Sequence, residues 1–142
     1  MSRGGGTLTL AIVVALAAAS CGDGEGDGSP SASRAAGRPP SDAVLTIVTP
    51  RSGTVIHGSA VELRVRLQGA RIVPQTTKEV VPDEGHLHVI LDDELISMTE
   101  GLRQTISEVA PGSHRITVEF VASDHAPFDP RVVAVTAFEV SP

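Results

Sequence analysis

The strict alternation of apolar and polar residues in short runs is the feature that most restricts the fold of this chain. In residues 60–67, Val61, Leu63, Val65 and Leu67 occupy every second position, and charged residues stand between them. Successive side chains of a β-strand point to opposite faces of the sheet, so a period of two predicts a strand with one buried face. A helix would place these apolar residues on different sides.

Similar short runs continue along the chain and are separated by Pro and Gly residues. The expected strands are 43–49, 60–67, 70–73, 87–91, 94–98, 105–109, 114–122 and 131–140. About seven or eight short strands in roughly 100 residues, with no convincing amphipathic helix, favour an immunoglobulin-like antiparallel β-sandwich. We therefore predict an all-β domain over residues 43–142.

Residues 1–20 have the pattern of an export signal. Arg3 precedes an apolar run over residues 8–19. A helix of that length spans roughly 18 Å, whereas a transmembrane helix needs about 20 apolar residues. Small residues then lead directly to Cys21, as at a signal-peptide cleavage site. We expect residues 1–20 to be removed on export.

The Ala-Ala-Ser-Cys run at 18–21 resembles the lipobox of bacterial lipoproteins, with Ala18 where that family prefers Leu. The resemblance implies that Cys21 is diacylated and becomes the new N-terminus. Two acyl chains give stable membrane anchoring, which one chain does not. The predicted location is therefore the outer face of the bacterial cytoplasmic membrane or the cell envelope. The alternative is an ordinary secreted protein with an incidental cysteine.

Residues 21–42 are predicted to be a lipidated cysteine followed by a disordered linker. After Cys21 this segment has no branched aliphatic or aromatic side chain. Such a composition cannot bury enough apolar surface to offset the entropy lost on ordering. A flexible linker of this length spans about 25 Å on average, enough to lift a domain away from a membrane surface.

Composition excludes several classes of function. The net charge is −6, and the only aromatic residues are three Phe. An acidic chain with so few rings is unsuited to nucleic acid, which requires basic surfaces and, for single strands, aromatic stacking. The single cysteine excludes an intramolecular disulfide and a cysteine-based zinc site. The expected partners are the membrane, through the anchor, and an unknown protein or envelope component.

The Gly-His-Leu-His-Val run at 85–89 is the most suggestive candidate site. If the intervening apolar residues face the core, His86 and His88 share the opposite face, about 6.5–7 Å apart. A His-x-His pair on a strand is a half-site for zinc or copper. His125, Asp83, Glu84 or His114 could supply a third ligand. The alternative is that both histidines are solvent-facing polar residues, or that they bond neighbouring loops.

Signs of catalysis are weak. The chain lacks a Gly-x-Ser-x-Gly elbow, a His-Glu-x-x-His helix and a phosphate-binding glycine loop. Asp92 and Asp93 form a carboxylate pair, but a tight turn between two strands explains them. In the loop around His125, Asp124 is expected to cap a turn by bonding backbone two residues on. We expect no enzymatic activity and no catalytic residues.

Four segments together resemble a family of small exported bacterial domains of unknown function. The family has a Gly-His-His-His-Leu-like strand, a Pro-Gly-x-His-Thr-like turn and an Asp-His-x-Pro loop; the corresponding residues here are 85–89, 111–115 and 123–127, with an entry strand at 49–55. Leu87 replaces the middle His, and Arg115 replaces the Thr. The resemblance covers about residues 43–140 and implies an immunoglobulin-like exported domain, with no agreed activity.

Two functional hypotheses follow. In the first, the chain is a membrane-anchored extracytoplasmic lipoprotein whose β-sandwich is a binding or interaction module of unknown ligand. In the second, it is an accessory protein that binds copper or zinc through His86, His88 and His125. The convergence of a third ligand group on both strand histidines would favour the second.

Overall fold

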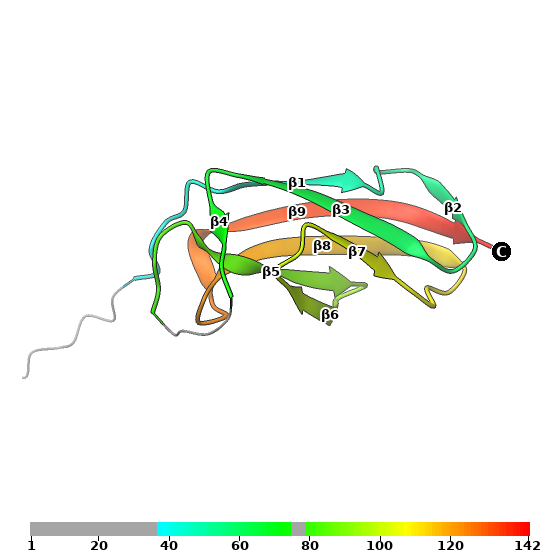
Figure 1. Cartoon of the computed structure of the whole chain (residues 1–142). Helices are drawn as coiled ribbons and strands as arrows, with labels where there is room; N and C mark the ends of the chain where they lie inside the picture. The colour runs from blue at the N-terminus through cyan, green and yellow to red at the C-terminus, as the bar shows by residue number, and fades with distance from the viewer. Residues whose placement is uncertain (1–36, 75–78) are drawn as a thin grey trace, which may run out of the picture. The chain divides into compact units, whose positions relative to one another are not determined.

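The computed structural model describes residues 37–74 and 79–142, and within them the chain is all-β (Figure 1). Nine strands are formed by these residues: β1 Val44–Thr49, β2 Val55–His57, β3 Val61–Gln68, β4 Arg71–Ile72, β5 Glu84–Leu91, β6 Glu94–Thr99, β7 Arg103–Ile106, β8 Gly112–Ala122 and β9 Pro127–Ser141. The predicted all-β class is therefore confirmed. The described part of the chain contains no helix of the length and hydropathy needed to cross a membrane.

The strands form two sheets. The smaller has the order β1-β3-β7, and both of its pairings are antiparallel. In β3, Val61, Leu63 and Val65 are buried while Glu62 and Arg66 are exposed. The alternation read from the sequence thus gives the observed orientation of this strand, with its apolar face toward the second sheet.

The larger sheet has the order β2-β9-β8-β5-β4, and β6 also pairs with β5. The long strands β5, β8 and β9 form its antiparallel centre. The short strands β2 and β4 add to β9 and β5 in parallel. In Figure 1, β1 and β3 lie on one side of β8 and β9, giving the two layers of a sandwich.

The register of the larger sheet separates a core face from an outer face. Leu87, Phe120 and Val132 lie side by side on β5, β8 and β9 and are all buried in the core. The next row along the strands therefore faces outward, because side chains alternate between faces. This outer row includes His88 of β5 and Glu119 of β8, which are direct partners.

Several strand predictions differ from the structure. Strands β5 and β9 begin at Glu84 and Pro127, three and four residues earlier than expected. Strand β2 was not expected, because its three residues are too few to show alternation; it is held by parallel pairing with the end of β9. The strand expected at 105–109 is displaced to Arg103–Ile106. Val109 is buried in the core outside any strand, and its N–H donates to the carbonyl of Ser59 at 2.9 Å.

Residues 37–42, at the end of the predicted linker, lie against the domain without forming a strand. The carbonyl of Pro39 accepts a hydrogen bond from the N–H of Asp129, and Ser41 and Asp42 both donate to the Asp83 carboxylate. The predicted signal peptide and Cys21 lie outside the described residues, so their roles stay predictions.

Candidate metal centre

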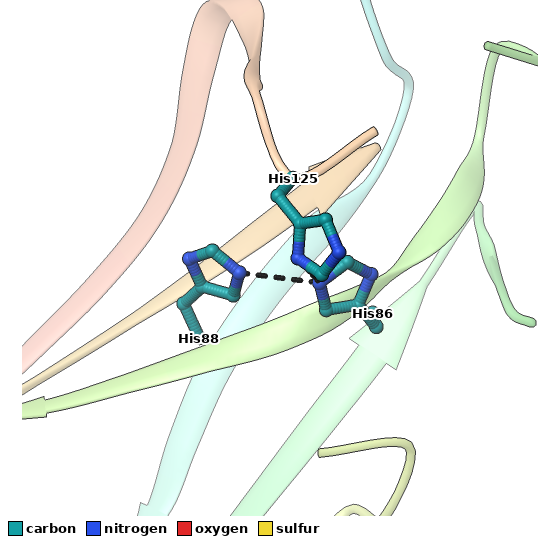
Figure 2. A group of neighbouring side chains, drawn as sticks. All are labelled: His86, His88 and His125. Atoms are coloured by element: carbon teal, nitrogen blue, oxygen red, sulfur yellow. Dashed lines mark hydrogen bonds between the residues drawn. The ribbon is translucent and has the colours of Figure 1, made fainter. Parts of the chain in front are cut away.

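His86 and His88 extend from the same face of β5, as their spacing predicted (Figure 2). Between them Leu87 is fully buried in the core, so both imidazoles belong to the outer face of the larger sheet. His88 is half-buried, whereas His86 is 0% exposed. The burial of His86 is unexpected for a residue on an outer face; its ring packs edge-on against that of His125, with 4.7 Å between the ring centroids.

Glycine 85 allows β5 to approach β8 closely beside His86. A Cβ at this position would lie only 1.8 Å from the carbonyl oxygen of Val121. No side chain can be accommodated there, so a glycine is required for the two strands to pair at this end of the sheet. The close pairing brings the end of β8, and the turn that follows it, over the start of β5.

His125 is held in that turn, between β8 and β9. Its φ is +66°, a left-handed conformation that histidine adopts more readily than most residues. The His125 N–H donates to the carbonyl of Ala122 at 2.9 Å, and the Ala122 N–H donates to the carbonyl of Ala126 at 3.1 Å. The predicted Asp124 cap is confirmed, because the N–H of Ala126 donates to the Asp124 carboxylate. The turn thereby directs the exposed His125 side chain back toward β5.

The structure brings the three predicted ligands together. The Nε2 atom of His86 lies 3.1 Å from Nε2 of His88 and 3.2 Å from Nδ1 of His125 (Figure 2). One ring nitrogen from each residue lies within 4.8 Å of the other two. Two zinc-bound nitrogens at about 2.0–2.1 Å, separated by a tetrahedral angle, would be about 3.3 Å apart. The two separations that involve His86 are therefore close to those of a metal site, and the third, between His88 and His125, is within 4.8 Å.

The electrostatic surroundings favour the neutral form of His86 and His88. Burial, followed by the proximity of His88 and His125, lowers the pKa of His86 to about 4. Burial and His125 also lower the pKa of His88, against an opposing effect from Glu119. At neutral pH His86 therefore has a free nitrogen lone pair, the form that binds metal ions.

His86 is poorly satisfied by protein groups alone. Its Nδ1 atom is buried and has no hydrogen-bond partner among the described residues. Its Nε2 atom faces two other ring nitrogens, although a ring nitrogen offers only one hydrogen or one lone pair. A cation bound to all three nitrogens would use the three lone pairs at once.

Glu119 is the carboxylate directly across from His88. It is 4% exposed, and both its oxygens accept 2.6 Å hydrogen bonds from Arg131. It is not one of the grouped ligands, because the group within 4.8 Å contains only the three histidines. Arg131 compensates its charge, so the cluster has no free carboxylate as a counter-ion from this residue.

The other three candidates for a third ligand lie in different contacts. Asp83 accepts hydrogen bonds from Ser41 and the Asp42 N–H, and Glu84 pairs with Arg71. His114 lies near the start of β8 and pairs with Asp92 at 2.6 Å. Among these alternatives, only His125 joins the two strand histidines.

Arg38 is a residue near the site that sequence reasoning missed. Its guanidinium donates to the Asp124 carboxylate and to the carbonyls of Ala126 and Pro127. It lies in a segment rich in Gly, Pro and Ser, and no pattern there indicates a partner 86 residues away.

Comparison with known proteins supports the fold alone. Fibronectin(III)-like modules of Clostridium thermocellum CbhA are 20% identical to this chain with a TM-score of 0.50, and the match covers 68% of this chain and 94% of theirs. The PKD domain from human KIAA0319 is 15% identical over 84% of this chain and 93% of its own, with a TM-score of 0.44. No protein-family model matches the sequence, and no curated protein matches it. The domain is an immunoglobulin-like β-sandwich.

Proposed function

We propose that this β-sandwich binds a transition-metal ion through His86, His88 and His125. The convergence of three imidazole nitrogens, one from each residue, carries the proposal. Two ligands come from a rigid strand and one from a hydrogen-bonded turn, so little reorganisation is needed for binding. Zinc and copper both suit imidazole ligands, and the protein acts as an accessory protein for one of these ions.

The exposure of His125 gives the ion a route to and from solvent. His125 is exposed, His88 is half-buried and His86 is fully buried, so the site reaches the surface at His125. Three protein ligands leave a tetrahedral ion one further position. An open position suits a protein that takes up and passes on its ion.

We also propose that the domain is anchored outside the cytoplasmic membrane by lipid on Cys21. The support is the apolar run, the small residues and the single cysteine at their end. In a bacterial host fed a palmitate analogue, the full chain is expected to become labelled and to fractionate with membranes. Cys21→Ser is expected to lose the label; an unlabelled wild type would contradict the anchor.

Metal titration of the full chain tests the site directly. Every arm carries Cys21→Ser, so that a free thiol cannot take the ion. Cu²⁺ and Zn²⁺ are each titrated in competition with a chromophoric chelator. His125→Asn removes one imidazole, and Asn tolerates the positive φ of this position. We expect its affinity to fall by more than about 100-fold, since even outer-shell partners change affinity by 10–100-fold.

His57→Ala is the matched control for this titration. His57 is an exposed histidine on β2 whose Nδ1 lies 2.7 Å from the Ser141 hydroxyl. Its removal should leave metal affinity unchanged. Equal affinity in wild type and His125→Asn, or no binding by the wild type, would overturn the proposed site.

One specific observation favours the interaction-module hypothesis. Large apolar side chains are exposed on β6 and β9 of the larger sheet: Leu95, Ile96, Met98, Val133 and Val135. Exposed apolar groups gathered on one sheet can mark a protein-binding surface. A photo-crosslinker at Met98 should capture one defined protein in living cells, and Val135→Lys should reduce that product; a product insensitive to Val135→Lys would contradict the hypothesis.

A further inference from the structure

We propose that Arg38 is a positioning residue for the metal ligand His125, an inference that rests on the proposed metal site. Arg38 donates from Nη1 and Nη2 to the two carboxylate oxygens of Asp124, at 2.6 and 2.9 Å. It also donates from Nη2 to the carbonyl of Ala126 and from Nε to that of Pro127. One guanidinium thus binds the residue before His125 and the two residues after it.

His125 depends on this support because its own side chain is exposed. The ring contacts that are seen for this imidazole are with the other two proposed ligands, His86 and His88, so the backbone of the turn determines from which direction it reaches them. That backbone is in the left-handed region at φ +66°, a conformation that persists where surrounding contacts fix it. The Arg38 fork is planar and suited to a carboxylate and neighbouring carbonyls together.

The segment that carries Arg38 is itself attached to the β8–β9 region. The Pro39 carbonyl accepts from the Asp129 N–H at 3.1 Å, just beyond the residues that Arg38 binds. Arg38 and Asp124 are only 29% and 26% exposed at their side chains, so their ion pair is partly shielded from water. Outer-shell groups that orient a ligand commonly change metal affinity by 10–100-fold.

The experiment measures Cu²⁺ affinity of the full chain, with Cys21→Ser in every arm. Arg38→Ala is expected to weaken binding by about tenfold or more. The Cu²⁺ affinity of Arg38→Lys should lie between those of Arg38→Ala and the wild type. An ammonium group can pair with the Asp124 carboxylate, but it cannot also bind the two neighbouring carbonyls as a planar guanidinium does. Ser41→Ala is the matched control: it removes a contact of the same segment to Asp83, away from the turn, and should stay within twofold of wild type.

A double-mutant cycle distinguishes a role of Arg38 in positioning His125 from a general effect of the substitution on the domain. If Arg38 acts through His125, adding Arg38→Ala to His125→Asn should have no further effect on affinity. The electron paramagnetic resonance spectrum of bound Cu²⁺ should lose a nitrogen coupling in Arg38→Ala, as in His125→Asn, while urea unfolding confirms that each variant is folded.

The outcomes distinguish the two proposals. A wild type that binds no Cu²⁺ overturns the metal site and this inference with it. A wild type that binds, with Arg38→Ala within twofold of it, overturns the role of Arg38 alone. An equal loss from Arg38→Ala in both backgrounds also overturns it, because the effect would then not pass through His125.

Discussion

A histidine lies at or just beyond each end of β8, and the two have opposite electrostatic settings. At the C-terminal end, the turn after β8 brings His125 onto His86 and His88, and ring nitrogens face ring nitrogens. At the N-terminal end, Nδ1 of His114 lies 2.6 Å from the Asp92 carboxylate and its Nε2 lies 2.7 Å from the Ala110 carbonyl. Ala122 follows His114 by eight positions along the strand, a distance of about 26 Å.

The difference shows how partners decide what a histidine can do. The hydrogen bond to Asp92 raises the pKa of His114, against the effect of burial, and both ring nitrogens have acceptors. That histidine is suited to carry a proton and hold the Asp92–Asp93 turn. His86 has its pKa lowered by burial and by like neighbours, which leaves a lone pair for a cation.

The shift of Tm on adding Zn²⁺ should distinguish the histidines at the two ends of β8 most strongly. A ligand at 100 times its Kd stabilises the folded state by about 2.7 kcal/mol, which raises the Tm of a domain of this size by about 10 °C or more. We expect this shift with Zn²⁺ for the wild type and for His114→Asn, but not for His88→Ala. A Zn²⁺ shift lost in His114→Asn and kept in His88→Ala would reverse the comparison.

Acid should destabilise the His86 end. The unfolded histidine has a pKa near 6.5, whereas His86 in the folded domain has a pKa of about 4. As the pH falls from 7 to 5, the unfolded chain takes up a proton that folded His86 does not. The free energy of unfolding should therefore drop by about 2 kcal/mol from this residue. Urea unfolding of the metal-free chain measures the drop, and His86→Leu should remove most of it; an unchanged pH slope would refute the burial argument.

The His114 end should respond in the opposite sense and more weakly. A histidine whose pKa is raised by folding gives stability that is present below pH ~6.5. This stability is lost as the pH rises through the pKa of the histidine in the folded state. The pKa of Asp92 is lowered by the Arg115 N–H and by His114, although burial acts against them, so its contribution is lost only as the pH falls below its usual range. Asp92→Asn keeps the turn, since Asn accepts its φ of +47°. It should cost about 0.5–1 kcal/mol at pH 5.5 and less at pH 8.5, by urea unfolding; an equal cost at both values would exclude the ion pair.

The sequence predicted those features that depend on local periodicity. Alternation in β3 and β8, and the His-x-His spacing in β5, each determine a face directly. The Asp92–Asp93 turn is confirmed, with both residues at positive φ between β5 and β6. The sequence named His125 as the third ligand but kept Asp83, Glu84 and His114 beside it, because the choice among them depends on how the β8–β9 turn meets β5.

The contacts that support the site are even harder to predict from the sequence. The complete burial of His86 follows from long-range packing, although its residue type and strand position predict exposure. Arg38 lies in a segment whose composition predicts disorder. Its guanidinium binds residues that follow it in the chain by 86 to 89 positions. Strand β2 is only three residues long and exists through pairing with the C-terminal strand.

Because the ligands lie far apart along the chain, the proposed site forms only when the domain folds. His86 and His125 are 39 residues apart, and their rings meet only after β5 has paired with β8 and the following turn has closed. An unfolded chain in transit keeps only the weak pair of His86 and His88. If residues 1–20 direct export before folding, the chain crosses the membrane without the complete site. On the proposed metal site, the ion would then be acquired on the far side, from the supply that the cell keeps there.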